Sequence, residues 1–317
     1  DAVAAADSGT LEVIGPYTLQ SGDNLGSVSS VIVTSGGSLT ASSTTVVTSL
    51  ISFTGDVIVQ AGGKLALQGA NTTSFGPTEE DNLCFTNGSV TLSDFDSTNY
   101  KFTITLEAGT QATIPQGKTL NLTNGYGAAK NGHNLTIAQN AALTVNGTLK
   151  GAGGNSAASA TDVSIAGTLT VGNSGILQLS GGVKTTVGAN GTLNLNESGV
   201  QDGNGKPYTS SNKRFTVESG GTVTAPSACT WDISAYSNNT LGSYTDASGN
   251  KVYGAMSGSG SGGAVAMIGT SELYSDLGTA LQNAQPGETV TLLTDVILGK
   301  TTPAIGSGVT LLVPRGI

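Results

Sequence analysis

Acidic side chains in two short runs are the groups in this chain best suited to chemistry. Glu79, Glu80 and Asp81 are consecutive, and Asp94 and Asp96 are separated by one residue. Two carboxyl groups held several ångströms apart can act as the acid and the base that hydrolyse a glycosidic bond. Both runs lie in sequence typical of surface loops, where carboxylates are solvated. Solvation therefore explains them better than catalysis.

The remaining reactive residue types are scarce. His133 lies in a predicted turn, and the only arginines are Arg214 and Arg315. The chain has no glycine-rich phosphate loop, no Cys/His set with metal-ligand spacing and no nucleophile motif. We therefore assign no catalytic, cofactor-binding or metal-binding residue, and we expect no cofactor and no enzymatic activity.

One stretch resembles the start of a calcium loop. Asp202, Asn204 and Gly205 have the right order, but Lys213 stands where an acidic ligand would have to close the loop. A similar run begins at Asp246, and in both runs a lysine and a tyrosine follow. A β-hairpin turn is the better interpretation of both stretches.

The elements that must position these residues form a repeat. The stretch Val31–Ala41 returns almost unchanged as Val57–Leu67, twenty-six residues later. Each copy is a short β-branched strand, a turn of small residues and a second alternating strand. Looser copies begin at Phe85, Ile114, Ile137, Val171, Val187 and Val217.

This repeat predicts an all-β fold, a parallel β-solenoid. One coil cannot bury its own apolar side chains, whereas stacked coils share an interior column and hydrogen-bond to one another. Pairs such as Gly36-Gly37 and Asn190-Gly191 suit the corners. A two-sheet sandwich with evenly spaced turns is the alternative. The repeats shorten after Ile137, which predicts shorter corners or a narrower cross-section in the second half.

Three regions are expected along the chain. Residues 1–253 form the solenoid, with an irregular loop and hairpin region at 198–253. Residues 254–270 are rich in Gly and Ser and predict a linker. Residues 71–83 and 151–161 are expected to be surface loops.

The third region, residues 271–317, has a different pattern. Apolar residues from Leu273 to Ala284 have helical spacing and predict one short helix, which Pro286-Gly287 ends. Strands are predicted at 289–293, 295–298 and 309–313. This pattern resembles the entry helix and first coil of pectin-lyase-like right-handed β-helix modules in bacterial cell-surface proteins. The resemblance implies a helix-capped start of a second β-helix stack, and residues 11–224 resemble β-helical adhesins more loosely.

Composition limits the partners. Only 10% of residues are charged and the net charge is -9, which excludes a basic surface for nucleic acid. No apolar run is long enough to span a membrane. The small residues of Asp1–Asp7 are typical of the region after a signal-peptide cleavage site and predict an exported chain. Cys84 and Cys229 either form an extracellular disulfide or are two free buried thiols.

These observations favour an extracellular structural or adhesive surface protein, a solenoid stalk or an element of a surface layer or filament. The alternative is a glycan-binding β-helix module, and a polysaccharide-degrading enzyme is less favoured. Expected partners are a second copy, paired through open strand edges, and glycans or host-cell ligands. Sugars would stack on tyrosines; the candidates are Tyr100, Tyr126, Tyr208, Tyr236, Tyr244 and Tyr253.

Overall fold

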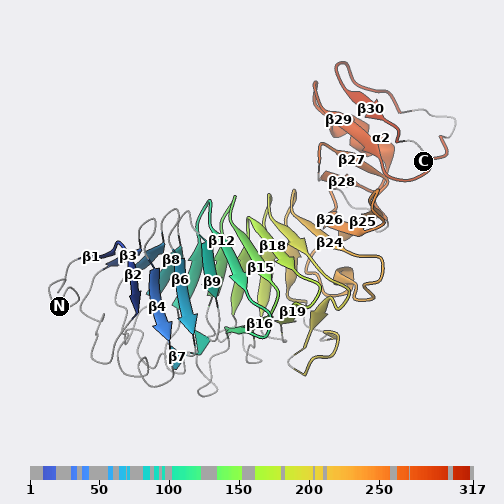
Figure 1. Cartoon of the computed structure of the whole chain (residues 1–317). Helices are drawn as coiled ribbons and strands as arrows, with labels where there is room; N and C mark the ends of the chain where they lie inside the picture. Colours follow the sequence, from blue (N-terminus) through green and yellow to red (C-terminus); the bar gives the residue numbers. More distant parts are fainter. Residues whose placement is uncertain are drawn as a thin grey trace.

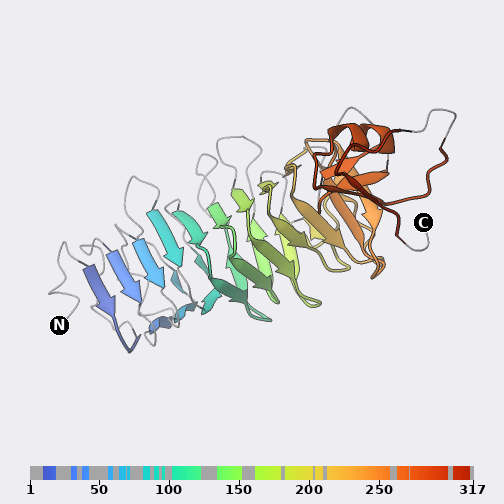
Figure 2. The same cartoon turned by 90° about the horizontal axis from the view of Figure 1, so that it is seen from above.

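The protein is a parallel β-solenoid, an all-β fold with one short helix in the described part of the chain (Figure 1). A computed structural model describes residues 10–18, 30–33, 38–42, 56–59, 64–68, 70–71, 81–85, 89–92, 95–96, 102–122, 134–151, 161–179, 183–202, 204–209, 213–257, 263–270, 272–298 and 303–314. Successive coils stack along one axis, and a smaller unit lies beyond their C-terminal end (Figure 2).

Three sheets run along the stack, and we name them A, B and C. Sheet A contains β1 (Thr10–Val13), β3 (Ser30–Val33), β5 (Asp56–Val59), β8 (Asp81–Phe85), β11 (Phe102–Leu106), β14 (Asn134–Ile137), β17 (Asp162–Ile165), β20 (Lys184–Val187) and β23 (Phe215–Val217). Sheet C contains β7 (Ala70–Asn71), β10 (Phe95–Asp96), β13 (Thr119–Asn121), β16 (Thr148–Gly151), β19 (Ile176–Leu179) and β22 (Val200–Gln201).

Sheet B ends differently from the other two. Its parallel strands are β2 (Pro16–Thr18), β4 (Ser38–Ser42), β6 (Lys64–Gln68), β9 (Ser89–Leu92), β12 (Gln111–Ile114), β15 (Ala142–Val145), β18 (Thr168–Val171), β21 (Thr192–Asn194) and β24 (Thr222–Ala225). An antiparallel hairpin, β25 (Leu241–Thr245) and β26 (Lys251–Ala255), then adds to β24. The parallel stack therefore stops at β24.

Alternating burial explains why these residues form the coils. Described strands such as β14, β15 and β18 alternate half-buried and buried residues, so every second side chain enters the interior. Paired residues then stack into columns, for example Leu143, Leu169, Leu193 and Val223 of sheet B. The column is continuous because each coil repeats the alternation in register.

The predicted shortening of the coils after Ile137 is wrong. Paired residues in sheet A are Val33, Val59, Phe85, Leu106, Ile137, Ile165, Val187 and Val217, with steps of 26, 26, 21, 31, 28, 22 and 30 residues. Ile114 and Val171 precede the corner from sheet B to sheet C, whereas the other repeat copies cover the corner from A to B. The repeat copies in the sequence therefore include two kinds of corner, A to B and B to C, and the distance between copies of different kinds is not the length of a coil.

An aromatic cap closes the solenoid near its C-terminal end. Trp231 stacks on Tyr236, with ring centroids 5.4 Å apart and planes at 6°. Phe215 packs edge-on against Trp231, and Tyr208 lies edge-on to Phe215 and Tyr236. The 3₁₀ helix η2 (Ile233–Ala235) carries the buried Ile233 into the same cluster. These large side chains cover the end of the aliphatic columns.

The predicted linker is shorter than expected. Residues 254–255 belong to β26, and residues 266–268 form β27 (Ala266–Ile268). β27 pairs antiparallel with β28 (Glu272–Tyr274) and with β29 (Thr289–Leu292). Residues 258–262 lie outside the described residues. A Gly/Ser-rich composition therefore did not distinguish a linker from the ends of strands β26 and β27.

The small C-terminal unit contains the helix α2 (Leu277–Asn283), which packs on the sheet formed by β28, β27, β29 and β30 (Thr310–Leu312). Leu273 was predicted in the helix but lies in β28, because Asp276 caps the first turn by accepting the Thr279 N–H at 2.7 Å. No described strand covers the predicted one at 295–298. Strands β29 and β30 pair in parallel, as the coils of a β-helix do. That they begin a second stack stays a prediction.

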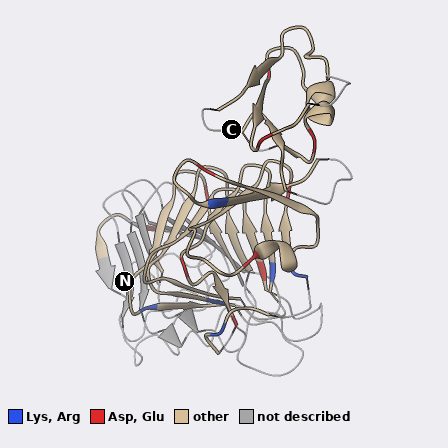
Figure 3. Cartoon of the chain, turned by 90° about the vertical axis from the view of Figure 1, so that its right-hand side faces the viewer, with Lys and Arg blue, Asp and Glu red and all other residues tan. Residues whose placement is uncertain are grey.

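No described helix is long and apolar enough to cross a membrane. Charged residues are scattered along the described ribbon (Figure 3).

Candidate functional site

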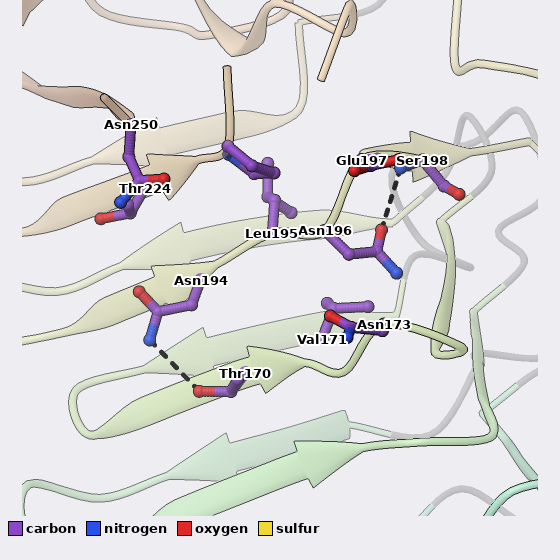
Figure 4. Close-up of a pocket in the computed structure, with 11 residues that line it drawn as sticks. Thr170, Val171, Asn173, Asn194, Leu195, Asn196, Glu197, Ser198, Thr224 and Asn250 are labelled. Carbon is purple, nitrogen blue, oxygen red and sulfur yellow. Dashed lines mark hydrogen bonds between the residues drawn. The ribbon is translucent and has the colours of Figure 1, made fainter. Parts of the chain in front are cut away.

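A groove crosses the outer surface where β18, β21 and β24 end, beneath the turn between β25 and β26 (Figure 4). Its cavity volume is about 640 Å³. We call it the asparagine groove because four of its described lining residues are asparagines. It is lined by Thr170, Val171, Asn173, Asn194, Leu195, Asn196, Glu197, Ser198, Thr224, Pro226 and Asn250.

One wall is a column of polar side chains on sheet B. Thr170 pairs with Asn194, and Asn194 pairs with Thr224, so the three residues lie on successive strands. Asn194 donates from Nδ2 to Thr170 Oγ1 at 3.2 Å, which fixes the amide. Its Oδ1 atom accepts no hydrogen bond from the described protein, and it is free for a ligand.

Asn196 holds the other wall in place. This residue is 7% exposed, and its Nδ2 donates to the carbonyl oxygens of Gly172 at 2.8 Å and Gly175 at 2.7 Å. Its Oδ1 accepts the Ser198 N–H at 3.1 Å. The side chain thus ties two successive corners together and positions Glu197 and Ser198, but it has little capacity left for a ligand.

Asn250 comes from the hairpin turn. The Asp246 carboxylate accepts the backbone N–H groups of Asn250 at 2.8 Å and Ser248 at 2.9 Å, and its second oxygen accepts from Asn250 Nδ2 at 3.1 Å. These hydrogen bonds lower the pKa of Asp246 below its ordinary value, and the two from Asn250 have the largest effect. The Asn250 Oδ1 atom has no described partner.

The same turn occurs at Asp202, whose carboxylate accepts the N–H groups of Asn204 at 2.8 Å and Lys206 at 3.0 Å. Hairpin turns at Asp202 and Asp246 are thus confirmed. The carboxylates hold the turns by these backbone bonds. The described residues contain no group of three or more His, Cys, Asp or Glu placed to hold a metal ion.

The structure does not bring the acidic residues singled out in the sequence into the groove. Asp81 lies in β8 and Asp96 in β10, so these positions are strands rather than the predicted loops. Glu79, Glu80, Asp94 and His133 lie outside the described residues, as does Arg315. The carboxylate that does line the groove, Glu197, was not predicted.

The prediction that tyrosines stack on sugars is wrong for three of the six candidates. Tyr208 and Tyr253 are 2% and 3% exposed, and Tyr236 stacks inside the aromatic cap. Tyr244 is half-buried, and Tyr100 and Tyr126 lie outside the described residues. The rings of Tyr208, Tyr236 and Tyr253 pack in the core, so these three do not form a platform for sugars.

Cys229 has a free thiol, so it is not joined to Cys84. The thiol is half-buried and lies 3.7 Å from the Trp231 carbonyl oxygen, to which it donates. Burial raises the pKa of Cys229, and the negative charge of Asp232 acts in the same direction. The thiol therefore stays protonated at neutral pH and is a weak nucleophile.

The groove residues gave little signal in the sequence. Asn194 and Asn196 alternate with Leu193 and Leu195, which is an ordinary strand pattern. Asn250 approaches them only because the hairpin folds back on β24. No local spacing connects these positions.

Comparison with protein-family models finds no matching family, and comparisons with curated proteins and with solved structures find no match. The class of the protein, a β-solenoid repeat protein, therefore follows from its own strands and register.

Proposed function

We propose that the protein is an extracellular structural or adhesive surface element, in which the solenoid acts as a stalk or as part of a surface layer or filament. The observation that carries this proposal is the unbroken stacking of sheet A from β1 to β23. Each coil is held by its neighbours on both sides, so length is gained without a larger core. Such a rod suits the separation or presentation of other groups.

The shape of the molecule tests this proposal. Small-angle scattering of the purified chain should give the profile of a rod, and rotary-shadowed images should show elongated particles. A compact, spherical scattering profile would overturn the proposal. An antibody against the solenoid should label intact producing cells before permeabilisation; labelling only after permeabilisation would contradict the surface location.

A relationship to pectin-lyase-like β-helix modules of bacterial surface proteins is part of the proposal. The helix α2, the following strand β29 and its parallel neighbour β30 support it. An experimental map with left-handed coils would contradict it.

Self-association through open strand edges is also proposed. In the described part of the chain, β1 and β30 each end a sheet, and Leu312 and Val313 beside the β30 edge are 48% and 53% exposed. Open edges with apolar side chains favour strand addition from a second copy. Sedimentation velocity over a wide concentration range should show larger species, and a monomer at every concentration would count against it.

A glycan-binding module is the second candidate, because the asparagine groove offers amide, hydroxyl and carboxylate groups in one concave surface. We do not propose glycan cleavage. Acid and base catalysis uses two carboxyl groups, and Glu197 is the one carboxylate among the described residues that line the groove.

A further inference from the structure

We propose that the asparagine groove binds a neutral, hydroxyl-rich oligosaccharide and discriminates against acidic glycans. The inference deepens the proposed surface role, on which it rests for the source of the glycan. Three properties of the groove carry it: its paired backbone, its charge, and the arrangement of its hydrogen-bonding side chains.

The backbone in the groove is already paired. β21 is hydrogen-bonded to β18 on one side and to β24 on the other, and β26 covers the far side of β24. A peptide added as an extra strand needs free N–H and C=O groups at a sheet edge. The side chains must therefore do the binding, which favours a ligand with many small polar groups over an extended peptide.

The negative charge of the groove disfavours the binding of anions. Its described lining contains no Lys or Arg, and its one ionisable group is the exposed Glu197. A phosphate, sulfate or uronate in this position would meet a like charge without a cation to offset it. A neutral ligand carries no such penalty.

Free hydrogen-bonding capacity matches hydroxyl groups. The Asn173 side chain has no hydrogen bond in the described structure, and Asn194 and Asn250 each keep a free Oδ1. An amide or carboxylate oxygen accepts from a sugar hydroxyl, and the Asn173 amide also donates to one. A site with several such groups rejects ligands that lack hydroxyls, because its polar atoms would then lose water without replacement.

The polar groups stand on two sides of the groove. Figure 4 shows Asn194 and Thr170 on one side and Glu197 and Ser198 on the other, with Leu195 between them. A sugar ring carries hydroxyls around its rim, so its rim reaches the polar groups of both walls. Leu195 is 6% exposed and packs in the core, so the contact is made by the polar walls. The bonds from Asn194 to Thr170 and from Asn196 to the corner carbonyls hold the walls before binding, which reduces the entropic cost.

Calorimetric titration of the full chain tests this inference with cellohexaose, mannohexaose and xylohexaose as neutral probes and hexagalacturonate as the acidic probe. At least one neutral probe should bind, and hexagalacturonate should bind more weakly than that probe. Asn173→Ala and Asn194→Ala should each weaken binding by about three- to tenfold, the effect of one lost hydrogen bond. Glu197→Gln should improve binding of hexagalacturonate.

Asn204→Ala is the matched control, because Asn204 is an exposed asparagine in a hairpin turn outside the groove. It should leave the affinity unchanged, and circular dichroism should show that all four variants keep the fold. Absence of binding by all three neutral probes would overturn the inference. So would binding that Asn173→Ala and Asn194→Ala leave unchanged, or tighter binding of hexagalacturonate. A failure of the rod proposal would be seen separately, in the scattering profile.

Discussion

Trp231 donates a hydrogen bond from Nε1 to the carbonyl oxygen of Tyr208, 3.1 Å away, across 23 residues of chain. The bond satisfies a buried indole N–H and anchors the aromatic cap to the last coil.

Replacement of Trp231 tests how much this cap stabilises the solenoid. Trp231→Phe removes the donor, leaves the Tyr208 carbonyl without this partner and opens space beside Tyr236. The free energy of unfolding should fall by about 2–4 kcal/mol. Guanidinium denaturation followed by circular dichroism measures it. Tyr244→Phe, a half-buried control without a described hydroxyl partner, should change it by less than about 0.5 kcal/mol.

Thr185 is a polar residue in the interior of the coil. Its side chain is 1% exposed, and Oγ1 has no hydrogen-bond partner in the described structure. Thr185→Val keeps the shape and removes the buried hydroxyl, so stability should rise by about 1 kcal/mol. The outward-facing neighbour Thr186 provides the control, and Thr186→Val should have little effect. A loss of stability in Thr185→Val would show that the hydroxyl has a partner, such as a buried water.

Gly191 lies where two corners touch. A Cβ atom there would clash with the carbonyl group of Ile165 in the preceding coil. Gly191→Ala should therefore lower the unfolding free energy by about 3 kcal/mol, because the clash is with backbone. Gly263 has open space around it, and Gly263→Ala should be neutral or slightly stabilising. Equal thermal melting of the two variants would contradict this account of the corner.

Asp246 makes the hairpin turn sensitive to acid. Its pKa is lower in the folded chain than its ordinary value because Asn250 and the neighbouring N–H groups hydrogen-bond the charged form. Such a carboxylate stabilises the fold above the unfolded-state pKa, and this contribution is lost as the pH falls through the folded-state pKa. Denaturation at successive pH values should show stability falling as the pH drops from the unfolded-state pKa through the folded-state pKa of Asp246. Asp246→Asn should make this fall smaller. An NMR titration that gave Asp246 an ordinary pKa would contradict the prediction.

The coil could be predicted from the sequence because its signal is local. The stretch Val31–Ala41 shows strand, corner and strand, and its copies show that the unit repeats. The phase of the repeat could not be predicted. The turns after Ile114 and Ile137 look alike, since each joins an aliphatic strand end to another alternating strand, yet one leads to sheet C and the other to sheet B. Only the pairing between coils separates them.

The candidate site depended on contacts that no spacing reveals. Asn250 reaches Thr224 and Asn194 because a hairpin reverses direction and lies against the last coil. The tyrosines failed for a related reason. Tyr208 and Tyr253 are amphipathic residues that suit either a ligand-binding surface or the core. Both are buried, because the end of the aliphatic columns has to be covered by large side chains.

The reversal of strand direction at β26 determines where the solenoid can be lengthened. β26 runs against β24, so a coil wound in the same sense as the others finds no matching template on that side of sheet B. A protein engineer who wished to extend this rod would insert new coils upstream of β24, where every neighbour has the same polarity, rather than append them after the hairpin.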